Sequence, residues 1–204
     1  MLVNRIQNNN IYNLYLYQKQ NTKKSNIINF RGKYQLGENF EFLNEQNLDT
    51  VTELFCAYRE NAGQTNISTE KTKQYISKNI NNPEHNILTI KDDGEYAGFL
   101  MFSKTRSTID LHPFFVIDAL FVSPEHRGKK LSSRLVKELQ SYAKYNNYKG
   151  IHVKTWANNV ESNRLYQNTG FNNESLKYST YFWANSGIFN YSDKYMSDAS
   201  DKKQ

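Results

Sequence analysis

The order of apolar and polar residues divides the middle of the chain into helical and extended segments. Apolar residues recur at helical spacing in segments that begin at Asn47 or Asp49, at Ser68, at Ser132 or Ser133, and at Val160. Runs rich in β-branched and aromatic residues predict strands at 40–43, 85–91, 96–105, 113–122, 151–156 and 178–183.

Turn-forming residues separate these segments. Asp92-Asp93-Gly94 between two strands is typical of a β-hairpin, and Gly170 is placed to cap the last helix. The helix between strands 113–122 and 151–156 predicts a β-α-β crossover that follows an antiparallel meander. We therefore expect an α+β, or mixed α/β, fold.

Composition divides the chain into three zones. Residues 1–38 are polar and Asn-rich, with short apolar bursts at 11–17 and 27–30, and are interpreted as a basic N-terminal extension. Residues 39–184 form the predicted folded domain. Residues 185–204 are too polar to bury a core, so we expect a disordered C-terminal tail.

Charge and composition exclude several classes of protein. Most of the net charge of +6 lies in the extension and the folded domain is near neutral, so we do not expect a nucleic-acid partner. No segment approaches the roughly 20 apolar residues of a membrane span, and residues 1–10 lack the apolar core of a signal peptide. Cys56 is the single cysteine, and the four histidines lack metal-ligand spacing. We expect a cytoplasmic protein with no membrane partner and no metal.

A basic loop that contains glycine lies between strand 113–122 and the helix that follows. It reads Arg127-Gly128-Lys129-Lys130-Leu131-Ser132-Ser133. The first amides of a helix have no acceptor within the helix, and the helix dipole favours an anion there. Basic turns before helices are common and usually only solvated, so the loop alone leaves both an anion site and a solvated turn open.

Two spaced motifs together resemble the GNAT superfamily of acetyl-CoA-dependent N-acetyltransferases. The family signature is Arg or Gln, two residues, Gly, one residue, and Gly or Ala, after a strand that ends in Val-x-Pro; this chain has Val122-Ser123-Pro124-Glu125-His126-Arg127-Gly128-Lys129-Lys130-Leu131-Ser132. The second motif is Asn-x-x-small-x-x-Leu-Tyr-x-x-x-Gly-Phe, which is met by Asn159, Ser162, Leu165, Tyr166, Gly170 and Phe171. The resemblance covers about 40–183. It implies the GNAT fold, with three layers in which helices cover both faces of a mostly antiparallel twisted sheet.

The resemblance also implies which residues hold acetyl-CoA. Backbone groups of Leu120, Phe121 and Val122 pair with the pantetheine arm as an added strand would, and Asn159 bonds the same arm. The pyrophosphate is expected to lie against Arg127, Gly128, Lys129, Lys130, Leu131, Ser132 and Ser133.

The loop departs from the family pattern at two positions. Lys130 stands where the family usually has Gly, and Ser132 where it has Gly or Ala. The Cβ of Lys130 either restricts backbone approach to the pyrophosphate or comes with a compensating charge. We expect the neighbouring His126 to be exposed to solvent.

Two residues are predicted to carry the chemistry. On an alternating strand, Val116, Asp118, Leu120 and Val122 share one face, so the Asp118 carboxylate is expected among apolar neighbours, where it accepts the amine proton. A structural ion pair is the alternative for Asp118. Tyr166 is expected to donate a proton to the departing thiolate, and simple packing against the sheet is its alternative.

The predicted activity is direct transfer of an acetyl group from acetyl-CoA to a primary amine. An acid on the strand and a near-neutral domain favour a small molecule as the acetyl acceptor, namely a polyamine, an amino sugar or an amino acid derivative. A peptide N-terminus or lysine is the alternative acceptor. A second alternative is a degenerate GNAT-fold binding module, in which Lys130 spoils the loop and the basic extension contacts a partner. Relatives are often dimers, which makes a homodimer compatible with the resemblance.

Overall fold

The computed structural model describes residues 34–109 and 111–174. Its elements are β1 (Phe40–Phe42), α2 (Leu48–Asn61), α3 (Thr69–Ser77), β2 (His85–Asp92), β3 (Glu95–Arg106), β4 (Pro113–Val122), the 3-10 helix η1 (Pro124–His126), α4 (Leu131–Tyr145), β5 (Ile151–Val153) and α5 (Val160–Asn168). The chain divides into two compact units, Met1–Leu165 and Tyr166–Gln204. The expected strand at 178–183 and the apolar bursts of the extension lie outside the described residues.

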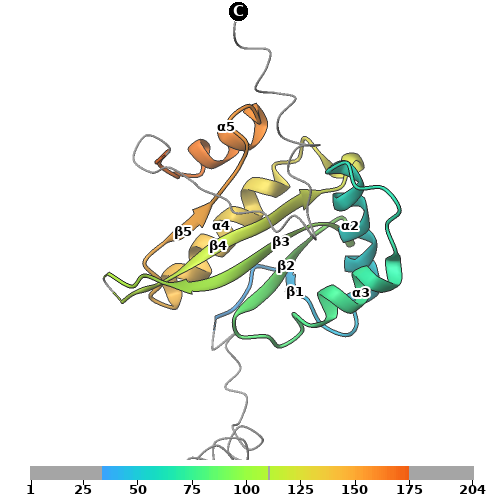
Figure 1. Cartoon of the computed structure of the whole chain (residues 1–204), viewed down its shortest axis with the longest axis horizontal. Helices are drawn as coiled ribbons and strands as arrows, with labels where there is room; N and C mark the ends of the chain where they lie inside the picture. The colour runs from blue at the N-terminus through green and yellow to red at the C-terminus, as the bar shows by residue number, and fades with distance from the viewer. Residues whose placement is uncertain (1–33, 110, 175–204) are drawn as a thin grey trace, which may run out of the picture. The chain divides into compact units, whose positions relative to one another are not determined.

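The first unit is built on a five-stranded sheet in the order β1-β2-β3-β4-β5 (Figure 1). Neighbouring strands are antiparallel from β1 to β4, and β5 pairs with β4 in parallel. The parallel pair is joined through α4, as a parallel pair requires. The predicted mixed α/β fold with a mostly antiparallel sheet and a β-α-β crossover is therefore confirmed.

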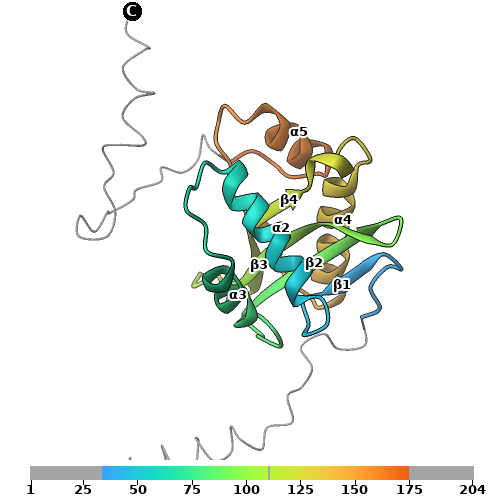
Figure 2. The same cartoon turned by 90° about the vertical axis from the view of Figure 1, so that its right-hand side faces the viewer.

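Helices cover both faces of this sheet (Figures 1 and 2). On one face Phe55 of α2 stacks on Phe99 of β3 with ring centroids 5.1 Å apart. On the other face Tyr142 of α4 stacks on Phe115 of β4, with ring centroids 5.8 Å apart. Each of these rings is buried, so both helices are held by removal of apolar area from water.

The hairpin between β2 and β3 has the predicted form. Asp92 pairs with Glu95, which leaves Asp93 and Gly94 as a two-residue turn. Both have positive φ, 52° and 88°, as the favoured hairpin turn requires. The turn therefore holds Asp92 at a defined place at the end of β2.

The start of α4 differs from the sequence prediction. Ser68 caps α3 as expected by accepting from the amide of Lys71, but neither Ser132 nor Ser133 caps α4. The helix begins at Leu131 after Lys130, which lies in the left-handed region at φ 61° and ψ 21°. Leu131 is 2% exposed, and burial of this side chain places the start of the helix one or two residues before the predicted Ser132 or Ser133.

Residues just before β1 contact α4. The Tyr34 hydroxyl donates to Glu138 at 3.0 Å, and the Gly37 amide donates to the same carboxylate at 3.3 Å. The Tyr34 ring lies 5.3 Å from the rings of both Tyr142 and Tyr145. The last residues of the segment interpreted as an extension thus pack on the helix that follows the basic loop.

Candidate functional site

The N-terminus of α4 presents unused backbone donors. Its N-cap, Lys130, makes no side-chain capping bond, and the first helical bond runs from Arg134 to the Lys130 carbonyl. Among the described residues, the amides of 128–133 find no acceptor. Gly128, at φ 82°, and Lys130 turn the loop through left-handed conformations before the helix begins. Because these donors gather at the positive end of a helix, the loop can bind an anion.

Within residues 34–109 and 111–174, the second half of β4 has no strand partner on the edge that faces β5. The parallel ladder joins residues 115–117 of β4 to 151–153 of β5 and ends at the pair Ile117–Val153. Beyond this pair β4 continues to Val122, while β5 has ended (Figure 1). Phe121 and Val122 are 5% and 7% exposed, so these residues offer backbone groups rather than side chains to a ligand. The carbonyl of Val122 already accepts from Nε of Arg127 at 3.2 Å.

A β-bulge lies where this edge becomes free. Phe102 pairs with Ile117 and Met101 pairs with Ala119, which leaves Asp118 as the extra residue of β4. Phe115 packs on α4, whereas Ala119 and Phe121 belong to the core cluster beside α2. The bulge therefore reverses the alternation of side chains along β4.

The expectation that Val116, Asp118, Leu120 and Val122 share one face was wrong for this reason. Asp118 is exposed rather than buried among apolar neighbours. Its Oδ1 accepts from the Ser103 hydroxyl at 3.3 Å. Partial desolvation raises the pKa of the Asp118 carboxyl, and the Ser103 bond and the charge of His85 oppose the rise. Asp118 thus carries a solvent-accessible carboxylate at the bulge.

The basic side chains of the loop have different partners. Nζ of Lys129 lies 2.5 Å from Oδ2 of Asp92, and Nδ1 of His126 lies 2.8 Å from the same oxygen. The His126 side chain is only 14% exposed, so the expectation of a solvent-exposed His126 was wrong. Lys130 is exposed and makes no ion pair within the described part of the chain. Its ammonium is therefore available to an anion at the α4 N-terminus, whereas that of Lys129 is held by Asp92.

The second sequence motif specifies both ends of α5. Oδ1 of Asn159 accepts from the amide of Ser162 at 3.0 Å, which caps the N-terminus of the helix. At the other end the Phe171 amide donates to the Tyr166 carbonyl, and the Gly170 amide to the Gln167 carbonyl. These two bonds and Gly170 at φ 87° form a Schellman C-cap.

Tyr166 is the first residue of the second unit, and it is 8% exposed. Its ring lies 5.4 Å from that of Phe171, which is the apolar contact that accompanies such a C-cap. The motif positions of Asn159, Gly170 and Phe171 thus have a structural reason. The cap uses Oδ1 of Asn159 and leaves its Nδ2 group outside that bond.

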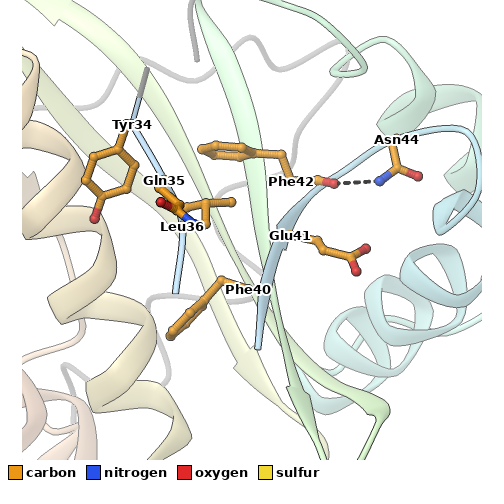
Figure 3. A pocket seen from close by; sticks show the side chains of 7 residues that line it. All are labelled: Tyr34, Gln35, Leu36, Phe40, Glu41, Phe42 and Asn44. Carbon is orange, nitrogen blue, oxygen red and sulfur yellow. Dashed lines mark hydrogen bonds between the residues drawn. The ribbon is translucent and has the colours of Figure 1, made fainter. Parts of the chain in front are cut away.

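Two surface hollows lie elsewhere on the first unit. The larger, of about 410 Å³, is lined by Tyr34, Gln35, Leu36, Phe40, Glu41, Phe42 and Asn44 (Figure 3). Phe40 and Glu41 leave β1 in opposite directions there. The smaller, of about 290 Å³, lies between α2 and residues 123–125. Neither hollow is lined by Asp118 or by residues 127–133, so both lie apart from the loop and the β4 edge.

Comparison with known proteins decides what this arrangement is. The acetyltransferase (GNAT) family matches residues 48–171, which is more than half of the chain. This chain belongs to the GNAT family. The uncharacterized N-acetyltransferase YhfO of Bacillus subtilis strain 168 is 26% identical over 125 residues, which are 61% of this chain and 83% of YhfO.

Solved GNAT structures share the fold. A ribosomal-protein-alanine N-acetyltransferase from Brucella melitensis biovar Abortus 2308 matches 72% of this chain and 99% of its own, with 16% identity and a TM-score of 0.59. AAC(6')-Iy, in complex with the bisubstrate analogue CoA-S-monomethyl-acetylneamine, matches 72% of this chain and 97% of its own, with 15% identity and a TM-score of 0.61. The protein is an acetyltransferase of the GNAT type.

Sequence reasoning missed two features of this GNAT site. The bulge at Asp118 has no marker such as glycine in β4, and the bonds of Asp92 to Lys129 and His126 join residues more than 30 positions apart.

In the part of the chain that the structure describes, no three His, Cys, Asp or Glu side chains gather as a metal ion would require. None of the described helices has the length and apolar character to cross a bilayer.

Proposed function

We propose that this GNAT protein transfers the acetyl group of acetyl-CoA directly to the primary amine of a small molecule. The observation that carries the proposal is the coincidence of the Asp118 bulge with the point where β4 loses its β5 partner. A carboxylate, a free strand edge and the amide-lined loop thereby lie along one strand and the turn that follows it.

The residues present fit an acetyl-CoA site. The unused amides of 128–133 suit the pyrophosphate, and the Lys130 ammonium adds charge beside them. The free edge of β4 at 118–121 suits the amide groups of the pantetheine arm, since an extended ligand can pair with an open strand. When bound, acetyl-CoA supplies an activated acetyl thioester. The Lys129 ammonium is left out of this site because Asp92 neutralises its charge, while the Lys129 amide stays among the donors.

Asp118 is proposed to accept the proton of the acceptor amine. A primary amine with a pKa near 10.4 costs about 4–5 kcal/mol to deprotonate at pH 7, and a carboxylate beside it lowers that barrier. The exposed Asp118 carboxylate has one hydrogen bond within the described residues, from Ser103, so it retains lone pairs for an ammonium group. Its negative charge also attracts a cationic acceptor.

Tyr166 is proposed to donate the proton that the departing sulfur requires. A phenol with a pKa near 10 stays protonated at pH 7, and it can donate to a thiolate whose conjugate acid has a pKa near 8.5. Helix α5 and its C-cap hold the Tyr166 backbone, which supports a fixed donor rather than a mobile one. Nδ2 of Asn159 is proposed to bond the pantetheine arm, since only Oδ1 is used by the cap.

The chemical class of the acceptor separates the proposal from its alternative. The Brucella protein is a ribosomal-protein-alanine N-acetyltransferase, and AAC(6')-Iy is bound to an analogue that contains acetylneamine. The same fold therefore accompanies both kinds of acceptor. The near-neutral folded domain favours a small amine in this chain, because a strongly acidic domain would suit a basic peptide better.

Calorimetry and an acceptor screen test the proposal. Acetyl-CoA is titrated into the full chain, with desulfo-CoA and a nucleotide that lacks pantetheine as controls. We expect micromolar binding that requires the pantetheine arm. Release of free thiol is then followed with polyamines, amino sugars and amino acid derivatives, and with peptides that carry a free N-terminus or a lysine. Turnover with peptides alone, or no binding of acetyl-CoA, would overturn the proposal.

A further inference from the structure

Asp92 lies at the centre of a charge cluster that ties the β2–β3 turn to the basic loop. Oδ2 of Asp92 contacts Nζ of Lys129 at 2.5 Å and Nδ1 of His126 at 2.8 Å. Asp93 lies 3.9 Å from the same ammonium but is 93% exposed, whereas the Asp92 side chain is 13% exposed. Asp92 is thus the sheltered acceptor of the cluster, and Asp93 stands at its rim.

The two sides of the cluster differ in rigidity. Asp92 is fixed by its pairing with Glu95 and by the two-residue turn that follows. On the loop side, the backbone of 128–130 forms no hydrogen bond through its amides within the described residues. Lys130 also holds a left-handed conformation, which persists only when its surroundings enforce it. The loop therefore relies on side-chain contacts for its shape.

Two contacts enforce that shape from either end. Arg127 bonds the Val122 carbonyl and ties the loop to the end of β4. Lys129, two residues on, bonds Asp92 and ties it to the hairpin. Between and after these anchors lie Gly128 and the start of α4, where the unused amides are found.

We propose that Asp92 is a positioning residue for acetyl transfer, which holds the amides of 128–133 in their anion-binding arrangement through Lys129 and His126. The inference rests on the proposed function, because these amides matter to the reaction only if they bind acetyl-CoA. The inference assigns different roles to two adjacent lysines. Lys129 is an anchor whose charge is cancelled, and Lys130 supplies the charge that the ligand meets.

Variants of three lysines test this division. Lys129→Met removes the anchor, and Lys130→Met removes the free charge. Lys73→Met is the matched control, because Lys73 also makes a 2.5 Å ion pair, with Asp49, and is 40% exposed against 48% for Lys129. Asp92→Asn and Asp92→Glu test the acceptor, and the conservative Glu variant should restore part of what Asn loses.

Binding and hydrogen exchange give separate readouts. We expect Lys129→Met and Asp92→Asn both to weaken acetyl-CoA binding about 10-fold, although one removes a positive charge beside the loop and the other a negative charge, because the lost group only positions the amides. Lys130→Met should weaken binding and flatten its salt dependence, since an exposed charge is screened. In the protein without ligand, exchange at the hydrogen-bonded amides that flank the loop, those of His126, Arg127 and Arg134, should become faster in Lys129→Met and Asp92→Asn, while β2 and β3 stay protected.

Several outcomes would overturn the inference. One is wild-type affinity in both Lys129→Met and Asp92→Asn, and another is exchange that rises throughout the sheet, which would mark Asp92 as a stability element only. A salt dependence that Lys129→Met flattens as much as Lys130→Met does would make Lys129 a ligand. If the wild type fails to bind acetyl-CoA, the proposed function fails, while the exchange readout still reports whether Asp92 orders the loop.

Discussion

Lys130 stores backbone strain at the start of α4, and replacing it by glycine should stabilise the protein. Its φ of 61° and ψ of 21° lie in the left-handed region, which costs a residue with a Cβ about 1–2 kcal/mol. Glycine adopts this region without that cost but loses about 0.5–1 kcal/mol to the greater freedom of the unfolded chain. We expect Lys130→Gly to raise the free energy of unfolding by roughly 1 kcal/mol, or the Tm by about 2–4 °C.

Lys130→Ala separates the backbone effect from the charge. A cation at a helix N-terminus opposes the helix dipole, so removing the ammonium is itself stabilising by some tenths of a kcal/mol. Alanine removes the charge and keeps the Cβ, whereas glycine removes both. Urea unfolding of both variants, at one pH and salt concentration, measures the difference. A Lys130→Gly protein no more stable than Lys130→Ala would refute the strain argument.

A second pair of variants reverses the substitution. The φ angle of Gly128 is 82°, whereas the φ angle of Gly150 is not positive. A Cβ added at either position meets no atom within 4 Å. Because both positions have room for a Cβ, the two variants differ only in the backbone conformation that alanine must adopt. We expect Gly128→Ala to lose about 1–2 kcal/mol of stability and Gly150→Ala to gain about 0.4–1 kcal/mol, because alanine reduces the freedom of the unfolded chain. Equal losses in the two variants would argue against a left-handed loop.

Four further variants test the site and its framework. Asp118→Asn should lower kcat/KM most near neutral pH and progressively less as pH approaches the pKa of the amine, which then deprotonates unaided; a ratio that is flat from pH 6 to about pH 10 would remove Asp118 as the base. Tyr166→Phe should lower kcat about 10²-fold with little change in acetyl-CoA affinity, which calorimetry and steady-state kinetics measure together, and unchanged turnover at pH 7 would remove Tyr166 as the acid. Gly98→Ala places a Cβ against the carbonyl oxygen of Phe121, so urea unfolding should show a loss of about 1–3 kcal/mol, and an unchanged urea midpoint would contradict the close approach of β3 and β4. Lys129 and then His126 lower the pKa of Asp92, so this carboxylate stabilises the fold above its unfolded-chain pKa and the contribution is lost as pH falls below about 4. The difference in urea midpoint between wild type and Asp92→Asn should therefore shrink in acid, and a constant difference would refute the linkage.

Much of the framework could be predicted from local sequence. The bounds of β4 match the predicted 113–122, and α5 begins at the predicted Val160, because a run of β-branched and aromatic residues and a capped amphipathic segment are local signals. The hairpin turn at Asp93-Gly94 is equally local, since two positive φ angles require these residue types. The family motif marked Gly170 and Phe171, and the structure gives them the role of a helix stop.

The arrangement of the site required tertiary structure. The bulge at Asp118 follows from the register of β4 against β3, so strict alternation put the carboxylate on a shared apolar face where it does not lie. Lys129 and Lys130 are adjacent and chemically alike, yet one is neutralised by Asp92 of the hairpin and the other faces solvent. By itself the sequence determined the elements, the basic loop and the resemblance to the GNAT family, since each depends on neighbours in the chain. Which charges and backbone groups stay free for a ligand was decided only by folding, because long-range packing and pairing determine which partners are already used.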